Sequence, residues 1–146
     1  MLDVANLRIA VVDDRGSVVD EFEELFGIEM PGLAVEKFEA ADDALAAIES
    51  GGTWSYWIVD LMMPTGEELG VAETEDGLST GIALIKRLMS SETMVTGGIV
   101  AFTLRDVSQE DFGSENAVVI MSKNENTPTD VVDHIRRALN GTVANG

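Results

Sequence analysis

The chain has 146 residues, with 27 acidic and nine basic side chains, and its formal net charge at pH 7 is −18. This length suits a single domain covering residues 1–146, and the acidity argues against direct binding of nucleic acid or of an anionic membrane, since both depend on Lys and Arg. The absence of cysteine excludes disulfides and thiolate metal sites, and no apolar run approaches the length of a membrane span, so we expect a cytoplasmic protein.

Short apolar runs alternate along the chain with segments of helical periodicity. The runs are rich in Val and Ile, which is typical of parallel strands buried on both faces. Strands are expected at residues 8–12, 33–38, 57–59, 99–102 and 117–121. Helices are expected to begin near Ser17, at Ala41, at Ser79 or Thr80, and at Pro128 behind a Thr127 cap. This alternation predicts an α/β fold with a five-stranded, doubly wound parallel sheet.

Three segments depart from a regular alternation. Residues 65–78 form a long acidic insertion between the third strand and the third helix, which we interpret as a mobile loop or as a lid that selects partners. Residues 107–115 contain few apolar side chains and an internal glycine, so the fourth helix should be short or irregular. Residues 140–146 read as a helix stop and a flexible tail or linker stub, which leaves an ordered core of about residues 7–139.

Four of the apolar runs end in polar residues of a particular kind. Asp13 and Asp14 follow the first run, Asp60 follows the third, Thr103 the fourth and Lys123 the fifth. Because the carboxyl ends of strands in an open parallel sheet line one crevice, these side chains should meet there. The second strand carries no such residue, which fits a sheet of order 2-1-3-4-5 with its crevice between strands one and three.

Three clustered carboxylates repel one another and need a proton, a neighbouring cation or a metal. Mg²⁺ is the natural ligand, with Mn²⁺ as an alternative, because hard divalent ions accept carboxylate oxygens and pair with phosphate. Lys123 supplies a compact positive charge and Thr103 a hydroxyl donor. Together these groups are complementary to a phosphoryl group carried by one aspartate, and Asp60 is the best nucleophile.

At these five positions the chain resembles the receiver domains of two-component response regulators, which have a flavodoxin-like fold. The resemblance implies that Asp60 accepts a phosphoryl group from a histidine kinase or phosphotransfer protein. It implies that Asp14, Asp60 and the main-chain carbonyl of Met62 bind Mg²⁺, with Asp13 acting mostly through a water molecule. Thr103 and Lys123 would assist the reaction. Such a protein modifies itself and slowly reverses the modification, so it is not classed as an enzyme.

The resemblance also implies partners, and two alternatives stay open. The signal would pass to a downstream protein or to an output domain outside this sequence, from a monomer or weak dimer. Leu104 and Ile120 depart from the family pattern, which prefers a small residue and an aromatic residue there. A receiver-like binding module that acts without phosphorylation is therefore one alternative. A metal-dependent phosphatase is a weaker one, because the residue two positions after Asp60 is Met62 and not an acid.

Overall fold

A single parallel sheet of five strands organises the protein. The computed structural model describes residues 6–64, 66, 77, 80–91, 94–104, 107–112 and 118–145. The strands are β1 (Arg8–Val12), β2 (Ala34–Phe38), β3 (Thr53–Val59), β4 (Met94–Thr103) and β5 (Val118–Ser122). Their order is β2-β1-β3-β4-β5, which confirms the order expected from the sequence. Strand β1 pairs with both β2 and β3, so the winding reverses there and the crevice opens between β1 and β3.

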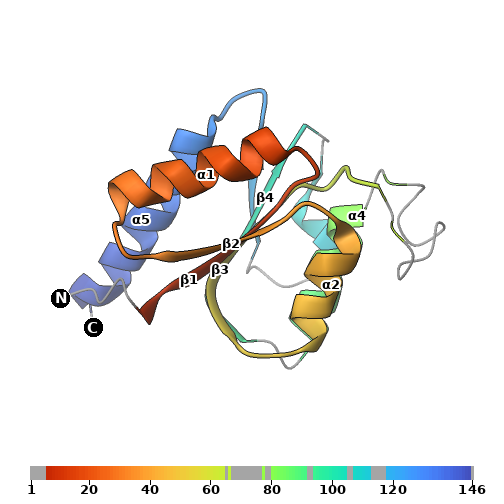
Figure 1. The fold of residues 1–146 in the computed structure, drawn as a ribbon, viewed down its shortest axis with the longest axis horizontal. Helices are drawn as coiled ribbons and strands as arrows, with labels where there is room; N and C mark the ends of the chain where they lie inside the picture. The colour runs from red at the N-terminus through yellow and green to blue at the C-terminus, as the bar shows by residue number, and fades with distance from the viewer. Residues whose placement is uncertain are drawn as a thin grey trace.

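Helices cover both faces of the sheet. They are α1 (Gly16–Glu29), α2 (Ala41–Glu49), α4 (Thr80–Ser90), α5 (Pro128–Asn145) and a 3₁₀ turn, η2 (Gln109–Phe112). The helix labelled α4 is the third helix expected from the sequence. Figure 1 shows α1 beside α5 on one face, while α2 and α4 lie on the other, and each pair is in contact. This is the doubly wound arrangement that a right-handed connection between parallel strands produces.

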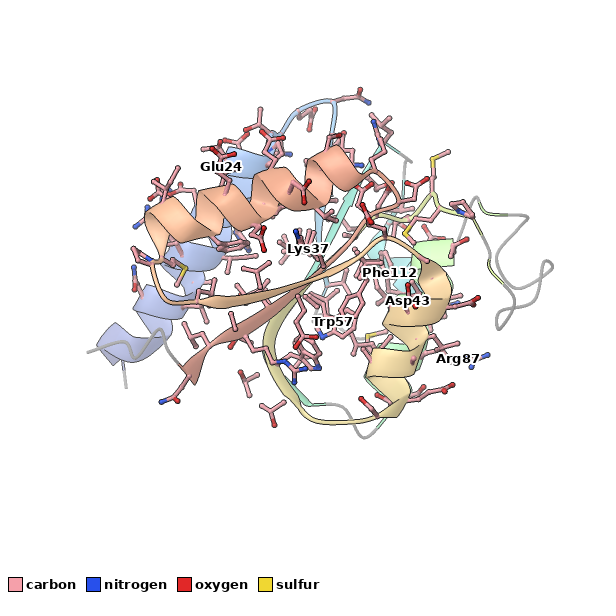
Figure 2. The ribbon with its side chains drawn as sticks, in the orientation of Figure 1. Glu24, Lys37, Asp43, Trp57, Arg87 and Phe112 are labelled. Atoms are coloured by element: carbon pink, nitrogen blue, oxygen red, sulfur yellow. The ribbon has the colours of Figure 1, made fainter. Side chains whose placement is uncertain are left out.

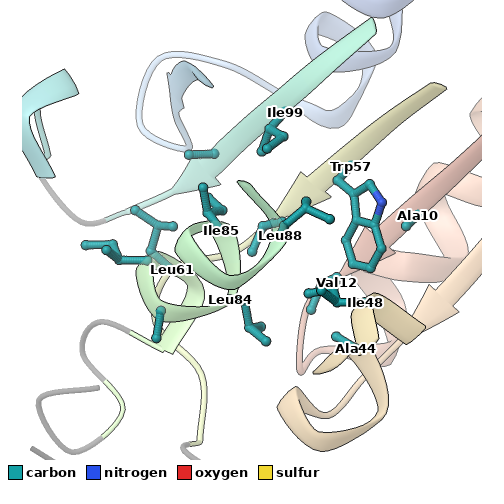
Figure 3. Packing of buried hydrophobic residues seen from close by; sticks show 14 of the residues in the cluster. Ala10, Val12, Ala44, Ile48, Trp57, Leu61, Leu84, Ile85, Leu88 and Ile99 are labelled. Carbon is teal, nitrogen blue, oxygen red and sulfur yellow. The ribbon is translucent and has the colours of Figure 1, made fainter. Parts of the chain in front are cut away.

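The two faces of the sheet bury two separate hydrophobic clusters. In β1, Ile9 and Val11 face the cluster under α1 and α5, whereas Ala10 and Val12 face the cluster under α2 and α4. Figure 3 shows the second cluster, where Trp57 lies among side chains from the strands and both helices. All four β1 residues are at most 1% exposed, because a strand covered on both faces has no solvent side.

Two helix ends differ from the sequence-based expectation. Helix α1 begins at Gly16, so Ser17 lies in its first turn and Arg15 occupies the N-cap position. Helix α5 continues to Asn145, so the helix stop predicted at residues 140–141 is wrong, while the flexibility of the tail stays a prediction. A glycine inside a helix costs only about 1 kcal/mol relative to alanine, and no proline follows Gly141 to force an end.

The expected irregularity between β4 and β5 is confirmed. Within residues 107–112, the described part of the expected fourth helix, the helical structure is the 3₁₀ turn η2, which is anchored by Phe112 at 2% exposure. Figure 2 labels Phe112 on the side of the sheet that faces α2. One aromatic anchor is too little to hold a full helix, because nucleation is costly.

Of the acidic insertion, only Gly66 and Gly77 are among the described residues, so its predicted loop lies outside them. Among the helices that the structure describes, none is long and apolar enough to cross a membrane.

Candidate functional site

Three aspartates meet where β1 and β3 end. Asp13 and Asp14 follow β1 and Asp60 follows β3, and one oxygen from each carboxylate lies within 4.8 Å of the others. The main chain continues to pair beyond the strands: the Asp60 N–H donates to the Val12 carbonyl (2.9 Å) and the Asp13 N–H to the Phe38 carbonyl (3.1 Å). Asp13 and Asp60 are 2% and 4% exposed, while Asp14 is exposed. The sheet therefore fixes a carboxylate cluster at its edge.

Lys123 bridges the two buried carboxylates. Its Nζ lies 3.0 Å from Asp13 Oδ2 and 3.3 Å from Asp60 Oδ2, and its side chain is 10% exposed. The backbone N–H of Lys123 donates to the carbonyl of Thr103 (2.8 Å), which sets the lysine beside the end of β4. Residues from strands one, three, four and five thus converge, although 110 positions separate Lys123 from Asp13 in the chain.

The environment of Asp60 raises the pKa of its carboxyl group. Burial is the largest cause, because it penalises the charged form, and the nearby negative charge of Asp13 acts in the same direction. The Lys123 ammonium and the Met62 N–H, which donates to Asp60 Oδ1 at 3.3 Å, oppose this shift without cancelling it. A single ammonium therefore leaves the cluster short of positive charge. The hard carboxylate oxygens and this residual repulsion both fit a divalent cation such as Mg²⁺.

The N-terminus of α4 holds the segment that follows Asp60. Thr80 Oγ1 donates to the carbonyl of Met63 (2.6 Å), and the Gly81 N–H donates to the carbonyl of Leu61 (3.0 Å). Helix and segment approach so closely that a Cβ on Gly81 would lie 2.2 Å from the carbonyl oxygen of Asp60. Met62, between these anchors, is 40% exposed beside the site. The helix thus presents the Met62 segment to the crevice.

We predict that Gly81→Ala destabilises the protein and disturbs the site. The added methyl group would overlap the Asp60 carbonyl, so the helix must move, at a cost of about 1–3 kcal/mol. Gly27→Ala is the matched control, because Gly27 is exposed on α1 and a Cβ there meets no atom within 4 Å. That variant should gain up to about 1 kcal/mol from helix propensity. Urea unfolding of both variants measures the difference, and equal stabilities would contradict the close approach.

A pocket of about 250 Å³ opens over the carboxylates. It is lined by Asp14, Arg15, Asp60, Met62, Leu104 and Lys123. Arg15 is not among the site residues expected from the sequence. The feature of the sequence that could have indicated it is a positive charge directly after the two aspartates, at the start of a predicted helix. Thr103 ends β4 and is fully buried, while the following Leu104 is 52% exposed at the pocket.

The structure therefore brings Asp13, Asp14, Asp60 and Lys123 together in one cluster. Met62 lies at its rim, and Thr103 lies at the neighbouring strand end. The chemical roles expected of these six residues stay predictions.

Several solved structures of response regulator receiver domains are similar to this chain. A receiver domain protein from Methanospirillum hungatei shares 21% identity, with 96% of this chain and 98% of that one covered and a TM-score of 0.65. The BeF₃-activated receiver domain of DrrB shares 19% identity over 92% and 97% of the two chains, with a TM-score of 0.62. The orphan response regulator HP1043 of H. pylori shares 11% identity over 94% and 99%, with a TM-score of 0.66.

The chain has the fold of a response regulator receiver domain. No protein-family model and no curated protein sequence matches it, so the likeness is one of structure. The receiver fold places its functional crevice at the carboxyl ends of the strands, at the point where strand order reverses. The carboxylate cluster of this chain occupies that position, between β1 and β3.

Proposed function

We propose that this receiver domain is a phosphorylation-controlled signalling switch. Asp60 accepts one phosphoryl group from a histidine kinase or phosphotransfer protein, and the modified domain passes the signal on through protein contacts. The observation that carries the proposal is the position of Lys123 Nζ, 3.0 and 3.3 Å from the buried carboxylates of Asp13 and Asp60. A buried acid cluster with one bridging ammonium is poorly suited to stabilising the fold and well suited to binding a phosphoryl group.

In the proposed reaction, a carboxylate oxygen of Asp60 attacks the phosphorus atom of the donor. The P–N bond of a phosphohistidine breaks as the new P–O bond forms, and the imidazole leaves with the bonding electron pair. Lys123 then pairs with a phosphoryl oxygen, because the Asp60 carboxylate has lost its negative charge in the acyl phosphate, a mixed anhydride. Asp60 is 4% exposed, and this low exposure strengthens the electrostatic contacts and limits attack of water on the acyl phosphate.

The carboxylates of Asp14 and Asp60 and the Met62 carbonyl would hold Mg²⁺, with Asp13 acting through a water molecule. Bound there, the ion supplies positive charge to the equatorial oxygens during transfer. This donor set of carboxylate, carbonyl and water oxygens is the one that Mg²⁺ prefers.

The proposal is tested by treating the protein with acetyl phosphate or phosphoramidate and Mg²⁺ and measuring its intact mass. We expect one phosphoryl group on the wild type and none on Asp60→Asn, because the amide is not a nucleophile. Asp43→Asn removes an exposed carboxylate on α2 and should be modified normally. Modification that persists in Asp60→Asn would show that another residue is the acceptor.

A receiver-like binding module is the second candidate, and the reduced η2 turn favours it. A domain that signals by moving its fourth helix needs a helix there, and the described residues 107–112 of this chain contain a four-residue 3₁₀ turn. Failure of several phosphodonors and of a panel of kinases to modify Asp60 would favour the module. The phosphatase alternative is weakened by Met62, which lines the pocket where a general acid would be needed.

A further inference from the structure

Arg15 lies at the mouth of the pocket and is tied to the carboxylate cluster. It lines the pocket together with Lys123, and its side chain is exposed. The Arg15 N–H donates to Asp13 Oδ1 at 2.9 Å, so the residue's main chain is held directly beside the aspartates. Its carbonyl accepts from the N–H groups of Val18 and Val19, which starts α1. Arg15 therefore has a fixed backbone position and a long, unburied side chain.

This position is unfavourable for an arginine on local grounds. Arg15 is the N-cap residue of α1, where Ser, Thr, Asp and Asn are preferred, and it makes no side-chain capping hydrogen bond. Its positive charge also lies at the positive end of the helix dipole, and the first turn contains no acidic residue to compensate. A residue that breaks local rules in this way, next to a reactive cluster, is expected to serve function more than stability.

The Arg15 guanidinium has no ion-pair or hydrogen-bond partner in the part of the chain that the structure describes. Other cations of this acidic protein do have partners there: Arg8 pairs with Glu36, Lys37 with Asp20 and Arg136 with Asp133. Lys123 is occupied by two buried carboxylates. Of the two cations that line the pocket, Arg15 is thus the one whose charge is open to an incoming ligand.

We propose that Arg15 binds the phosphoryl oxygens of the donor before transfer, which deepens the function proposed above and rests on it. A guanidinium presents paired N–H donors that match two oxygens of a phosphoryl group. Arg15 recruits the dianionic group from solvent and orients its phosphorus toward Asp60. Lys123, in contrast, acts deeper in the site, once the phosphoryl group has arrived. The ligand of Arg15 is a phosphoryl dianion, whether carried by an acyl phosphate or by a phosphohistidine.

The test compares Arg15→Ala, Arg15→Lys and Lys86→Ala, where Lys86 is an exposed cation on α4 away from the pocket lining. The rate of Asp60 modification is followed against acetyl phosphate concentration at saturating Mg²⁺. For Arg15→Ala we expect the half-saturating concentration to rise about tenfold, with the maximal rate within about twofold of wild type, as for a lost charge-assisted contact. Arg15→Lys should recover part of the loss, and Lys86→Ala should match the wild type.

Binding of Mg²⁺ alone, measured by calorimetry without donor, separates this role from a structural one. Arg15→Ala should bind Mg²⁺ as well as the wild type or slightly better, because a positive charge near the ion has been removed. Equal half-saturating concentrations in Arg15→Ala and wild type would overturn the inference, as would a tenfold loss of Mg²⁺ affinity. A wild type that no donor modifies would instead overturn the proposed function itself.

Discussion

Replacing Lys123 with alanine is expected to lower the free energy of unfolding by about 3–5 kcal/mol at pH 7 without metal, because it leaves buried charges unpaired. The ammonium lies 3.0 Å from Asp13 and 3.3 Å from Asp60, whose side chains are 3% and 5% exposed. Without it, two carboxylates would face each other where water cannot solvate them. The loss should shrink as the pH falls, because a protonated carboxyl group needs no counter-charge. Urea unfolding of the wild type and of Lys123→Ala, at several pH values from neutral to acidic, measures this loss of stability and its dependence on pH.

Lys37→Ala is the matched control for this prediction. Lys37 also bonds two carboxylates, Asp20 at 3.0 Å and Glu23 at 3.1 Å, but these groups are solvent-exposed. Water solvates exposed charges when a partner is removed, so the urea midpoint should hardly change. The double variant Asp60→Asn, Lys123→Ala should recover part of the lost stability, because only one buried carboxylate remains. A Lys123→Ala variant as stable as Lys37→Ala would show that the lysine does not neutralise the cluster.

Magnesium should stabilise the wild-type protein by about 2.7 kcal/mol at one hundred times its dissociation constant, since it binds the folded cluster and not the unfolded chain. Asp60→Asn removes one proposed ligand, so the same Mg²⁺ concentration should stabilise that variant much less. Without metal, the Asp60→Asn variant should be more stable than the wild type by roughly 1–2 kcal/mol, because it lacks a buried carboxylate next to Asp13. Thermal melts with Mg²⁺ and with a chelator measure both differences.

The pH dependence of stability provides an independent check on Asp60. Burial raises the pKa of Asp60 above its ordinary value of 3.8, so the folded protein takes up this proton at a higher pH than the unfolded chain. Stability therefore falls as the pH rises from 3.8 to the raised pKa, and the full cost is present above it. Asp60→Asn should lack this contribution. Glu24→Gln, which removes an exposed charge on α1, should keep it. If wild type, Asp60→Asn and Glu24→Gln showed the same Mg²⁺ effect and the same pH dependence of stability, repulsion at Asp60 could not be their cause.

These two predictions describe one electrostatic balance. In the proposed function, Mg²⁺ would supply the positive charge that the carboxylate cluster lacks, and a phosphoryl group would then bring new negative charge to the same place. Leu104 follows the buried Thr103, is 52% exposed and lines the same pocket as Asp60, so a change of charge there would occur beside a surface side chain.

The sequence by itself determined that there are five strands and which polar residues follow them, and it fitted the strand order of a doubly wound sheet. Strands β3 and β4 begin earlier than expected, at Thr53 and Met94. A continuous apolar run that stops at Asp13, Asp60 or Lys123 is a local pattern, and parallel strands always bring such ends to one edge. Helix α2, expected to begin at Ala41, begins there in the structure. The sequence also predicted an irregular segment before β5, because the small number of apolar side chains there can be read directly from the composition. These features follow from patterns within a single element.

Only the tertiary structure decided how neighbouring elements approach one another at the site. The start of α1 at Gly16 places Arg15 on the pocket, and nothing in the local sequence favours an arginine as N-cap. The contact of Gly81 with the Asp60 carbonyl depends on how closely α4 packs against the end of β3. The continuation of α5 past Gly141 overrides a local stop signal. In each case the outcome rests on contacts between segments distant in the chain or on a small balance of helix propensities, and neither has a signature in a short stretch of sequence.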